Sequence, residues 1–164
     1  NQTMKVFLLK VWKSLPDSEL LRGILIWLIT PKFLVGVVGV VINQAGEILL
    51  LKHTYRHKYP WGLPGGWLKR GEQPMQALRR EILEETGMTV EVLRPLVVEG
   101  DDDWPRADLI FLCRMVDDEF SSSDEVHQAK FFGLAELPNI LPSQKRLIQK
   151  IYEMMLFDGS ITNQ

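Results

Sequence analysis

Three glutamates lie close together in the segment WGLPGGWLKRGEQPMQALRREILEETGMTV, directly after a glycine-rich stretch. Glu81, Glu84 and Glu85 are near enough in sequence to share part of one helix surface. Like charges at such spacings destabilise a helix by about 0.2–0.5 kcal/mol per pair, so a merely solvated surface would more naturally include lysines. Carboxylates beside glycine carbonyls are the hard oxygen ligands that Mg²⁺ takes in proteins. The spacing therefore favours a divalent-cation site over a solvated helix surface.

A loop followed by a helix is needed to hold these carboxylates together. Gly65 and Gly66 disfavour regular structure and leave backbone oxygens accessible to a cation. Residues 74–86 have a helical composition, because Pro74 is tolerated in a first turn and Gly87 commonly ends a helix. An apolar stripe on this helix is expected to pack on a sheet and consists of Met75, Leu78 and Ile82.

Two arginines, Arg79 and Arg80, directly precede Glu81. Residues one or two positions apart do not face each other on a helix. We therefore expect these arginines not to neutralise the whole acidic cluster from the same face.

The composition limits the size and the partners of the protein. The chain has 164 residues, of which 46% are hydrophobic and 24% charged, so one domain of ordinary size is expected. The net charge of -2 and the pI of about 6.0 argue against binding of polymeric nucleic acid. The single cysteine, Cys113, lies in an apolar segment typical of a strand, and no disulfide can form within the chain. A reducing, cytoplasmic location is expected.

The N-terminal third contains two apolar runs, at residues 23–30 and 33–42, which are interrupted by Pro31 and Lys32. Neither run reaches the roughly 18–20 apolar residues that a membrane-spanning helix needs. Residues 1–13 lack a signal-peptide cleavage pattern. We expect a core element without a spanning segment, and the alternative is an amphipathic helix on a membrane surface or a partner chain.

The remaining patterns predict alternating helices and strands. A helix is expected from Ser14, with Asp17 completing a capping pattern, to Pro31. The apolar runs on either side of the NQAG turn predict a hairpin of two buried strands. Three further strands are expected at residues 89–100, 106–116 and 127–134. A final helix at 142–156 is expected to bury one side, made of Leu147, Ile148, Ile151, Met154 and Met155.

Residues 66–88 resemble the Nudix box at every constrained position, namely Gly66, Glu72 and the run from Arg80 to Met88. The preceding WGLPGG and the strand order extend the resemblance over most of the chain from Phe33 onward, but not over residues 1–32. The resemblance implies an α/β Nudix fold, in which a mixed β-sheet is sandwiched between helices. The implied organisation is a Nudix domain at 33–158, an additional helical N-terminal extension at 1–32 and a tail at 159–164.

The resemblance also implies a hydrolase that uses Mg²⁺, or Mn²⁺ as a substitute, to cleave a diphosphate linked to another moiety. Glu81, Glu84 and Glu85 would bind the metal, with the Gly65 carbonyl as a further ligand. Arg80 would orient Glu81 or Glu84. Glu72 would face the metal cluster as a supporting ligand or a structural partner. Such a cation neutralises the diphosphate and activates the attacking water.

Several candidates lie outside the box. Glu125, in the polar loop SSSDE, is a candidate metal ligand or general base, and the alternative is a solvated loop residue. Arg56 and Lys58 are candidates for binding the non-reacting phosphates, against an ordinary surface loop. Trp104 could stack on a base, although packing at a sheet edge is the favoured interpretation. No histidine has metal-ligand spacing, so no catalytic histidine is expected.

Three classes of function remain open at this point. The first is a Nudix pyrophosphohydrolase acting on a nucleoside triphosphate or a nucleotide derivative, with an ADP-ribose or nucleotide-sugar pyrophosphatase as the runner-up. The second is a nucleotide-sensing module, which would be expected to lose box carboxylates that this chain keeps. The third is docking of the apolar N-terminal segment on a membrane or a partner, including a homodimer. The helical N-terminus favours a compact, MutT-like enzyme.

Overall fold

The computed structural model of this chain describes residues 18–101 and 104–157. The chain divides into two compact units, Asn1–Lys32 and Phe33–Gln164, which are described separately. The described part of the first unit is helix α2, Glu19–Ile29. Ser18 caps this helix by accepting a hydrogen bond from the Leu21 amide at 3.5 Å.

Helix α2 is apolar around most of its surface, and none of its residues is buried. Leu20 and Trp27, for example, are 73% and 66% exposed. No helix in the described ranges is long and apolar enough to cross a membrane. The predicted start of the helix at Ser14 and Asp17 lies outside the described residues.

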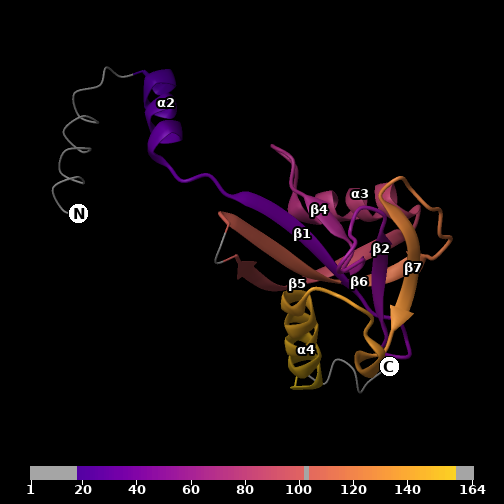
Figure 1. The fold of residues 1–164 in the computed structure, drawn as a ribbon. Coiled ribbons are helices and arrows are strands. Elements are labelled where there is room, and N and C mark those ends of the chain that lie inside the picture. The colour runs from indigo at the N-terminus through magenta and orange to yellow at the C-terminus, as the bar shows by residue number, and fades with distance from the viewer. Residues whose placement is uncertain (1–17, 102–103, 158–164) are drawn as a thin grey trace. The chain divides into compact units, whose positions relative to one another are not determined.

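Two β-sheets form the centre of the second unit (Figure 1). The larger has the order β4-β1-β6-β5, with β1 at Leu34–Val41, β4 at Gly65–Trp67, β5 at Thr89–Gly100 and β6 at Arg106–Asp117. The smaller has the order β3-β2-β7, with β2 at Ile48–His53, β3 at Trp61–Gly62 and β7 at Val126–Phe132. Strands β1 and β6 are parallel and the other pairs antiparallel, so the larger sheet is mixed.

The predicted hairpin of two buried strands is wrong in its pairing. A tight turn does join β1 to β2, with the Asn43 amide donating to the Glu47 carbonyl at 3.0 Å and Gly46 at φ +75°. Beyond one bridge between Ile42 and Ile48, however, the two strands enter different sheets. Their partners, β6 and β7, lie much later in the chain, and local periodicity carries no signal for such pairings.

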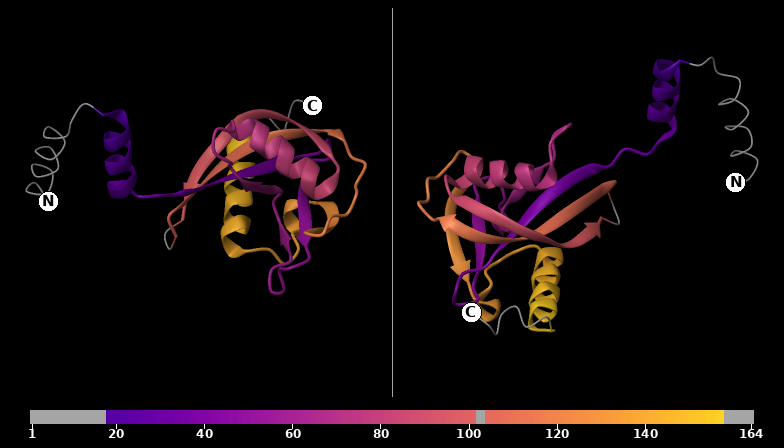
Figure 2. Two further views of the ribbon diagram at one scale, coloured as in Figure 1. Left: turned by 90° about the horizontal axis from the view of Figure 1, so that it is seen from above. Right: turned by 180° about the vertical axis from the view of Figure 1, so that it is seen from behind.

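Two hydrophobic clusters cover opposite faces of the sheets. Alternate residues of β2 point to opposite sides, so Leu49 and Leu51 join one cluster while Ile48 and Leu50 join the other. Helix α3, Pro74–Thr86, packs in the first cluster, and α4, Pro142–Phe157, packs in the second. Figure 2 shows the two helices on opposite sides of the strands. The predicted fold, a mixed sheet sandwiched between helices, is confirmed.

The C-terminal elements differ from expectation in the end of one strand, which is β7 at Val126–Phe132, and in one helix side chain. A short 3-10 helix, η1 at Leu134–Glu136, precedes α4. In α4 the buried residues include Tyr152, whereas Met154, which was expected inside, is 36% exposed. Tyr152 is buried because its hydroxyl donates to the Gly46 carbonyl of the β1–β2 turn, which gives the polar end of the ring a partner.

Candidate metal and nucleotide site

Helix α3 presents its carboxylates at the border between its buried and exposed faces. It begins at Pro74 and ends at Gly87, which has φ +72° and therefore suits a glycine. Its buried residues are Ala77, Leu78, Ile82, Glu85 and Thr86. Glu85 is thus carried into the protein by the same face that packs on the sheets, while Glu84 stays outside.

The two glycines of β4 bring the helix and the sheet edge into close contact. A Cβ atom at Gly66 would lie 2.3 Å from Cδ of Glu81, so only a glycine admits this carboxylate against the strand. Gly65 has φ +152°, and a Cβ there would lie 2.2 Å from the backbone oxygen of Val37. The expectation that these glycines disfavour regular structure is wrong, because they belong to strand β4 and pair with β1. The close approach of the helix and of β1 requires the GG pair.

Arg80 connects three of the glutamates. Its Nη1 donates to Oε1 of Glu81 at 2.7 Å and to Oε2 of Glu84 at 3.0 Å. Its Nε and Nη2 donate to the two oxygens of Glu72 at 2.8 and 3.0 Å, and this bidentate pair lowers the pKa of Glu72 to about 2. As expected, the arginines do not neutralise the whole cluster, although the long side chain of Arg80 reaches residues i+1 and i+4. Glu85 is the carboxylate that it does not bond.

Glu85 is the carboxylate of the site whose pKa is raised. Its side chain is buried, and the loss of water raises its pKa to about 7. A backbone hydrogen bond from Gly65 opposes this rise, while the charges of Glu81 and Glu125 add to it. Its Oε2 atom is buried without a hydrogen-bond partner. A buried, unsatisfied carboxylate oxygen next to two further carboxylates is destabilising unless a cation occupies the space between them.

These residues fit a divalent cation, although they are not arranged as a complete cage. Within residues 18–101 and 104–157, no three acidic, histidine or cysteine side chains form a ready set of ligands. Glu81 and Glu84 are instead hydrogen-bonded to Arg80. The unpartnered oxygen of Glu85 and the space over Gly66 that admits Glu81 are the features that suit a cation.

A second group of unpartnered polar atoms lies around Gly62. A Cβ atom there would lie 2.6 Å from Nη1 of Arg56 and 3.5 Å from Nε2 of His53. The Arg56 Nη1 atom and both ring nitrogens of His53 are buried without a hydrogen-bond partner. Burial, assisted by the charge of Arg56, lowers the pKa of His53 to about 4, so the imidazole is neutral at pH 7. Arg56 also acts on Glu85 electrostatically, which places its positive charge near the acidic cluster.

Comparison with known proteins identifies the family. Residues 32–151 match the NUDIX domain. This chain belongs to the Nudix hydrolase family. It is 32% identical over 114 residues to an ADP-ribose pyrophosphatase of Methanocaldococcus jannaschii, covering 66% of this chain and 68% of the relative. It is also 32% identical over 127 residues to the NAD-capped RNA hydrolase NudC of Haemophilus influenzae, covering 70% of this chain but only 47% of that protein.

Solved structures show the same Nudix fold. The crystal structure of a UDP-X diphosphatase superposes with a TM-score of 0.69 over 97% of this chain and 81% of its own, at 21% identity. At this level of identity the match shows the fold alone.

Glu125 lies near the Nudix glutamates, as its electrostatic effect on Glu85 shows. The loop that carries it is held by Thr54, whose amide donates to the Glu125 carbonyl at 2.9 Å and whose hydroxyl donates to the Asp124 carbonyl at 2.8 Å. The Glu125 side chain itself is exposed. Its role as ligand or base stays a prediction.

Lys58 and Trp104, the other predicted substrate-binding residues of this Nudix domain, lie in different surroundings. Lys58 is exposed, and its ammonium lies 5.3 Å from the centre of the Tyr59 ring. Trp104 is 71% exposed in the turn between β5 and β6, where its amide donates to Asp101. The favoured interpretation of Trp104, packing at a sheet edge, is wrong, because the turn projects its ring into solvent.

Sequence reasoning missed His53, Gly62 and Trp67. His53 ends strand β2 directly after Lys52, and two polar residues at the end of an apolar strand are the signal that could have drawn attention to it. Gly62, in β3, leaves room for Arg56. Trp67, in β4, is 46% exposed directly after the GG pair. Nothing local in the sequence distinguishes it from a core tryptophan.

Proposed function

We propose that this Nudix domain is a metal-dependent pyrophosphohydrolase that cleaves a phosphoanhydride bond of a nucleoside diphosphate linked to another moiety. The observation that supports it best is the buried, unpartnered oxygen of Glu85 beside Glu81 and Glu125. A protein that used this helix only as a surface would have no reason to bury a carboxylate without a partner. The attack would come from water on phosphorus.

The residues of the box would have two roles, which are binding the metal and positioning its ligands. Glu81, Glu84 and Glu85 would hold Mg²⁺, or Mn²⁺ in its place, with the Gly65 carbonyl as a further ligand. A divalent cation there supplies charge that offsets the diphosphate and makes water more acidic. Arg80 positions Glu81 and Glu84 through its Nη1 atom, and Glu72 holds Arg80 in that orientation through two hydrogen bonds.

The proton of the attacking water needs an acceptor close to the reacting phosphorus. A box glutamate or Glu125 would serve, since the charge of Glu125 acts on Glu85. Arg56 would bind a non-reacting phosphate, because its Nη1 is buried without a hydrogen-bond partner. This atom lies in the space that a side chain at position 62 would fill. Lys58, which is exposed, and Trp104 would act only through a longer substrate.

The substrate class is proposed from the relatives. Proteins named ADP-ribose pyrophosphatase and NAD-capped RNA hydrolase are among them, so a nucleotide derivative with two halves is favoured alongside a nucleoside triphosphate. The first of these names supports the ADP-ribose alternative over the MutT-like preference that the helical N-terminus indicated. A sensor without catalysis is disfavoured, because all three helix glutamates are present.

The location and the assembly are also part of the proposal. Cys113 is a free, buried thiol, as expected in the reducing cytoplasm. The partner would be a small nucleotide and not a polymeric nucleic acid. A homodimer stays a prediction, as does docking of the exposed apolar helix α2 on a membrane surface.

Hydrolysis of a nucleotide panel in Mg²⁺ and ¹⁸O-labelled water tests the activity. The panel would contain nucleoside triphosphates, ADP-ribose, nucleotide sugars and dinucleotides, with products separated by chromatography. We expect at least one member to be cleaved and the label to enter a phosphate of the product, since water attacks phosphorus. Label in a sugar hydroxyl would reject attack at phosphorus, and no cleavage of any member would reject the activity.

Replacing Arg56 by alanine is expected to raise KM for the best panel substrate at least about tenfold, with a smaller change in kcat. The reason is the loss of a charge-assisted hydrogen bond to a phosphate, which contributes about 1.5–3 kcal/mol. Arg114→Ala is the matched control, because Arg114 is exposed and pairs with Glu91 on the surface. An unchanged KM in Arg56→Ala would reduce Arg56 to an ordinary loop residue.

A further inference from the structure

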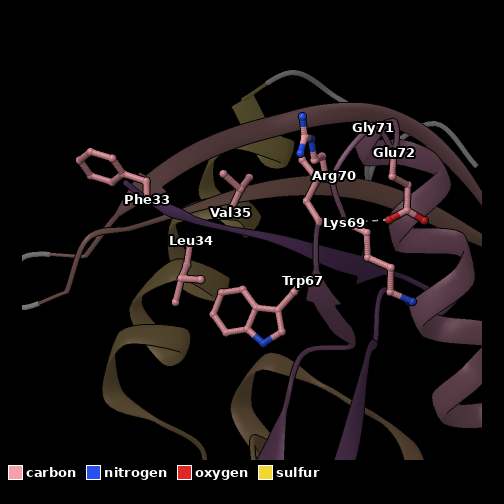
Figure 3. Close-up of a pocket in the computed structure, with 9 residues that line it drawn as sticks. Phe33, Leu34, Val35, Trp67, Lys69, Arg70, Gly71 and Glu72 are labelled. Carbon is pink, nitrogen blue, oxygen red and sulfur yellow. Dashed lines mark hydrogen bonds between the residues drawn. The ribbon is translucent and has the colours of Figure 1, made fainter. Parts of the chain in front are cut away.

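A surface pocket of about 370 Å³ opens where the short edge strand β4 ends and leaves the start of β1 uncovered (Figure 3). Its lining consists of residues 33–35 and residues 67–72. This volume lies within the range of roughly 300–1,000 Å³ that is usual for small-molecule sites. One end of the pocket is Glu72, the residue that holds Arg80. The pocket therefore adjoins the hydrogen bonds between Glu72 and Arg80.

Trp67 forms an aromatic wall of this pocket and is held in place by an ion pair. Its cross-strand neighbour, Gly36, has no side chain. The Arg106 guanidinium lies over the indole, 4.7 Å from the ring centre, and donates to Asp108 at 2.8 Å. A Cβ atom at Gly36 would lie 2.0 Å from Oδ1 of Asp108, so the pair occupies the space that a side chain would take. The exposed indole is thus held in a fixed orientation.

Two cationic residues, Lys69 and Arg70, line the pocket beside apolar side chains and Glu72. Lys69 and Arg70 are exposed on the loop after β4, and Figure 3 shows both beside the pocket. Consecutive residues of a strand point to opposite faces, so Gly66 meets Glu81 on one face of β4 while Trp67 lies on the other. Since β4 is the edge of its sheet, residues 68–72 lead around that edge from the indole to the glutamates.

We propose that this pocket, the Trp67 pocket, binds the aromatic base and the adjoining phosphate of the nucleotide half of the substrate. The inference rests on the proposed function, because the diphosphate of the same molecule would lie at the glutamates. An indole with cations next to it matches a planar heterocycle that carries negative charge. Every base has a face that can stack, so the pocket selects for a nucleoside without selecting one base. A diphosphate that carries only sugars would lack this contact.

Binding of two small probes to the metal-free protein tests the inference without requiring turnover. Calorimetry would compare adenosine 5′-monophosphate with ribose 5-phosphate, which has the same phosphate and sugar but no base. We expect the wild type to bind the nucleotide at least about tenfold more tightly. Trp67→Ala is expected to lose this preference, and Trp67→Phe to keep most of it, because a phenyl ring still stacks. Phe157→Ala is the control, since Phe157 is 97% exposed at the end of α4 and does not line the pocket.

Kinetics give an independent measurement. For the best panel nucleotide, Trp67→Ala is expected to raise KM about tenfold with little change in kcat, because the base contact is the same in substrate and transition state. Equal affinity of the wild type for the two probes, or an unchanged preference in Trp67→Ala, would overturn the inference. A change in the oligomeric state of Trp67→Ala, with its preference for the nucleotide probe intact, would also overturn the inference. It would assign the pocket to a contact between chains. If no panel nucleotide is hydrolysed, the proposed function fails while the probes still decide the pocket.

Discussion

Turnover by Glu85→Gln is expected to fall at least about a hundredfold, while the metal-free variant becomes more stable than the wild type at pH 7 and above. The loss of turnover corresponds to roughly 2.7 kcal/mol of transition-state stabilisation and follows from removing a charged cation ligand. The gain in stability follows because glutamine fills the same buried space without a charge that has lost its water. An amide in the place of a surface carboxylate would produce neither effect.

The stability difference should depend on pH with a defined sign. The folded-state pKa of Glu85 is about 7, above the value of 4.5 in the unfolded chain, so the folded state holds the proton more tightly. The stability that the wild type gains from the protonated Glu85 is fully present below pH 4.5 and is lost as the pH rises through 7. The wild type should therefore lose on the order of 2–3 kcal/mol across this window in metal-free buffer. Glu85→Gln should lose correspondingly less.

Melting curves with and without Mg²⁺, measured beside turnover, check this prediction. Mg²⁺ binds the folded state and should raise the Tm of the wild type, and this shift should shrink in Glu85→Gln. Excess chelator should abolish wild-type turnover. Glu84→Gln separates the two effects, because Glu84 is 55% exposed and paired with Arg80, so its turnover and Mg²⁺ shift should fall with little change in stability. Retained turnover and a retained Mg²⁺ shift in both variants would mean that these glutamates do not serve a metal.

Alanine at the two adjacent glycines of β4 is expected to affect different properties, turnover at Gly66 and stability at Gly65. Gly66→Ala should lower turnover about a hundredfold, because its Cβ would occupy the position of the Glu81 carboxylate. The colliding atoms are the flexible end of a side chain that can move away, so stability should change by about 1 kcal/mol or less. Gly65→Ala should instead lose about 3 kcal/mol or more, because its Cβ meets the immovable backbone of Val37 at positive φ.

Urea unfolding and turnover of the same preparations would separate these outcomes. Gly100→Ala is the control, since a Cβ there meets nothing within 4 Å and the residue is far from the box in sequence. Full turnover by Gly66→Ala would show that Glu81 does not need its place against the strand. Wild-type stability of Gly65→Ala would show that β4 is able to shift away from β1.

The sequence by itself determined the local features of the site. The glycine pair, the helix at residues 74–86 with its end at Gly87, and the clustering of the three glutamates all follow from composition and spacing over about thirty residues. These properties are local because a turn or a helix is stabilised mainly by residues within a few positions of one another. The five longer strands were located for the same reason, since alternation and apolar runs are properties of a short segment, whereas the short strands β3 and β4 were missed.

Only the tertiary structure decided what distinguishes one glutamate from the next. Glu84 and Glu85 are adjacent and chemically identical, yet one is exposed and held by Arg80 while the other is buried with an unpartnered oxygen. Burial and pKa depend on which elements cover a residue, and those elements come from distant parts of the chain. The separation of β1 and β2 into two sheets, and the support of Trp67 by Arg106, have the same origin. Contacts between residues far apart in sequence leave no periodic signal, so they are fixed only when the whole chain packs.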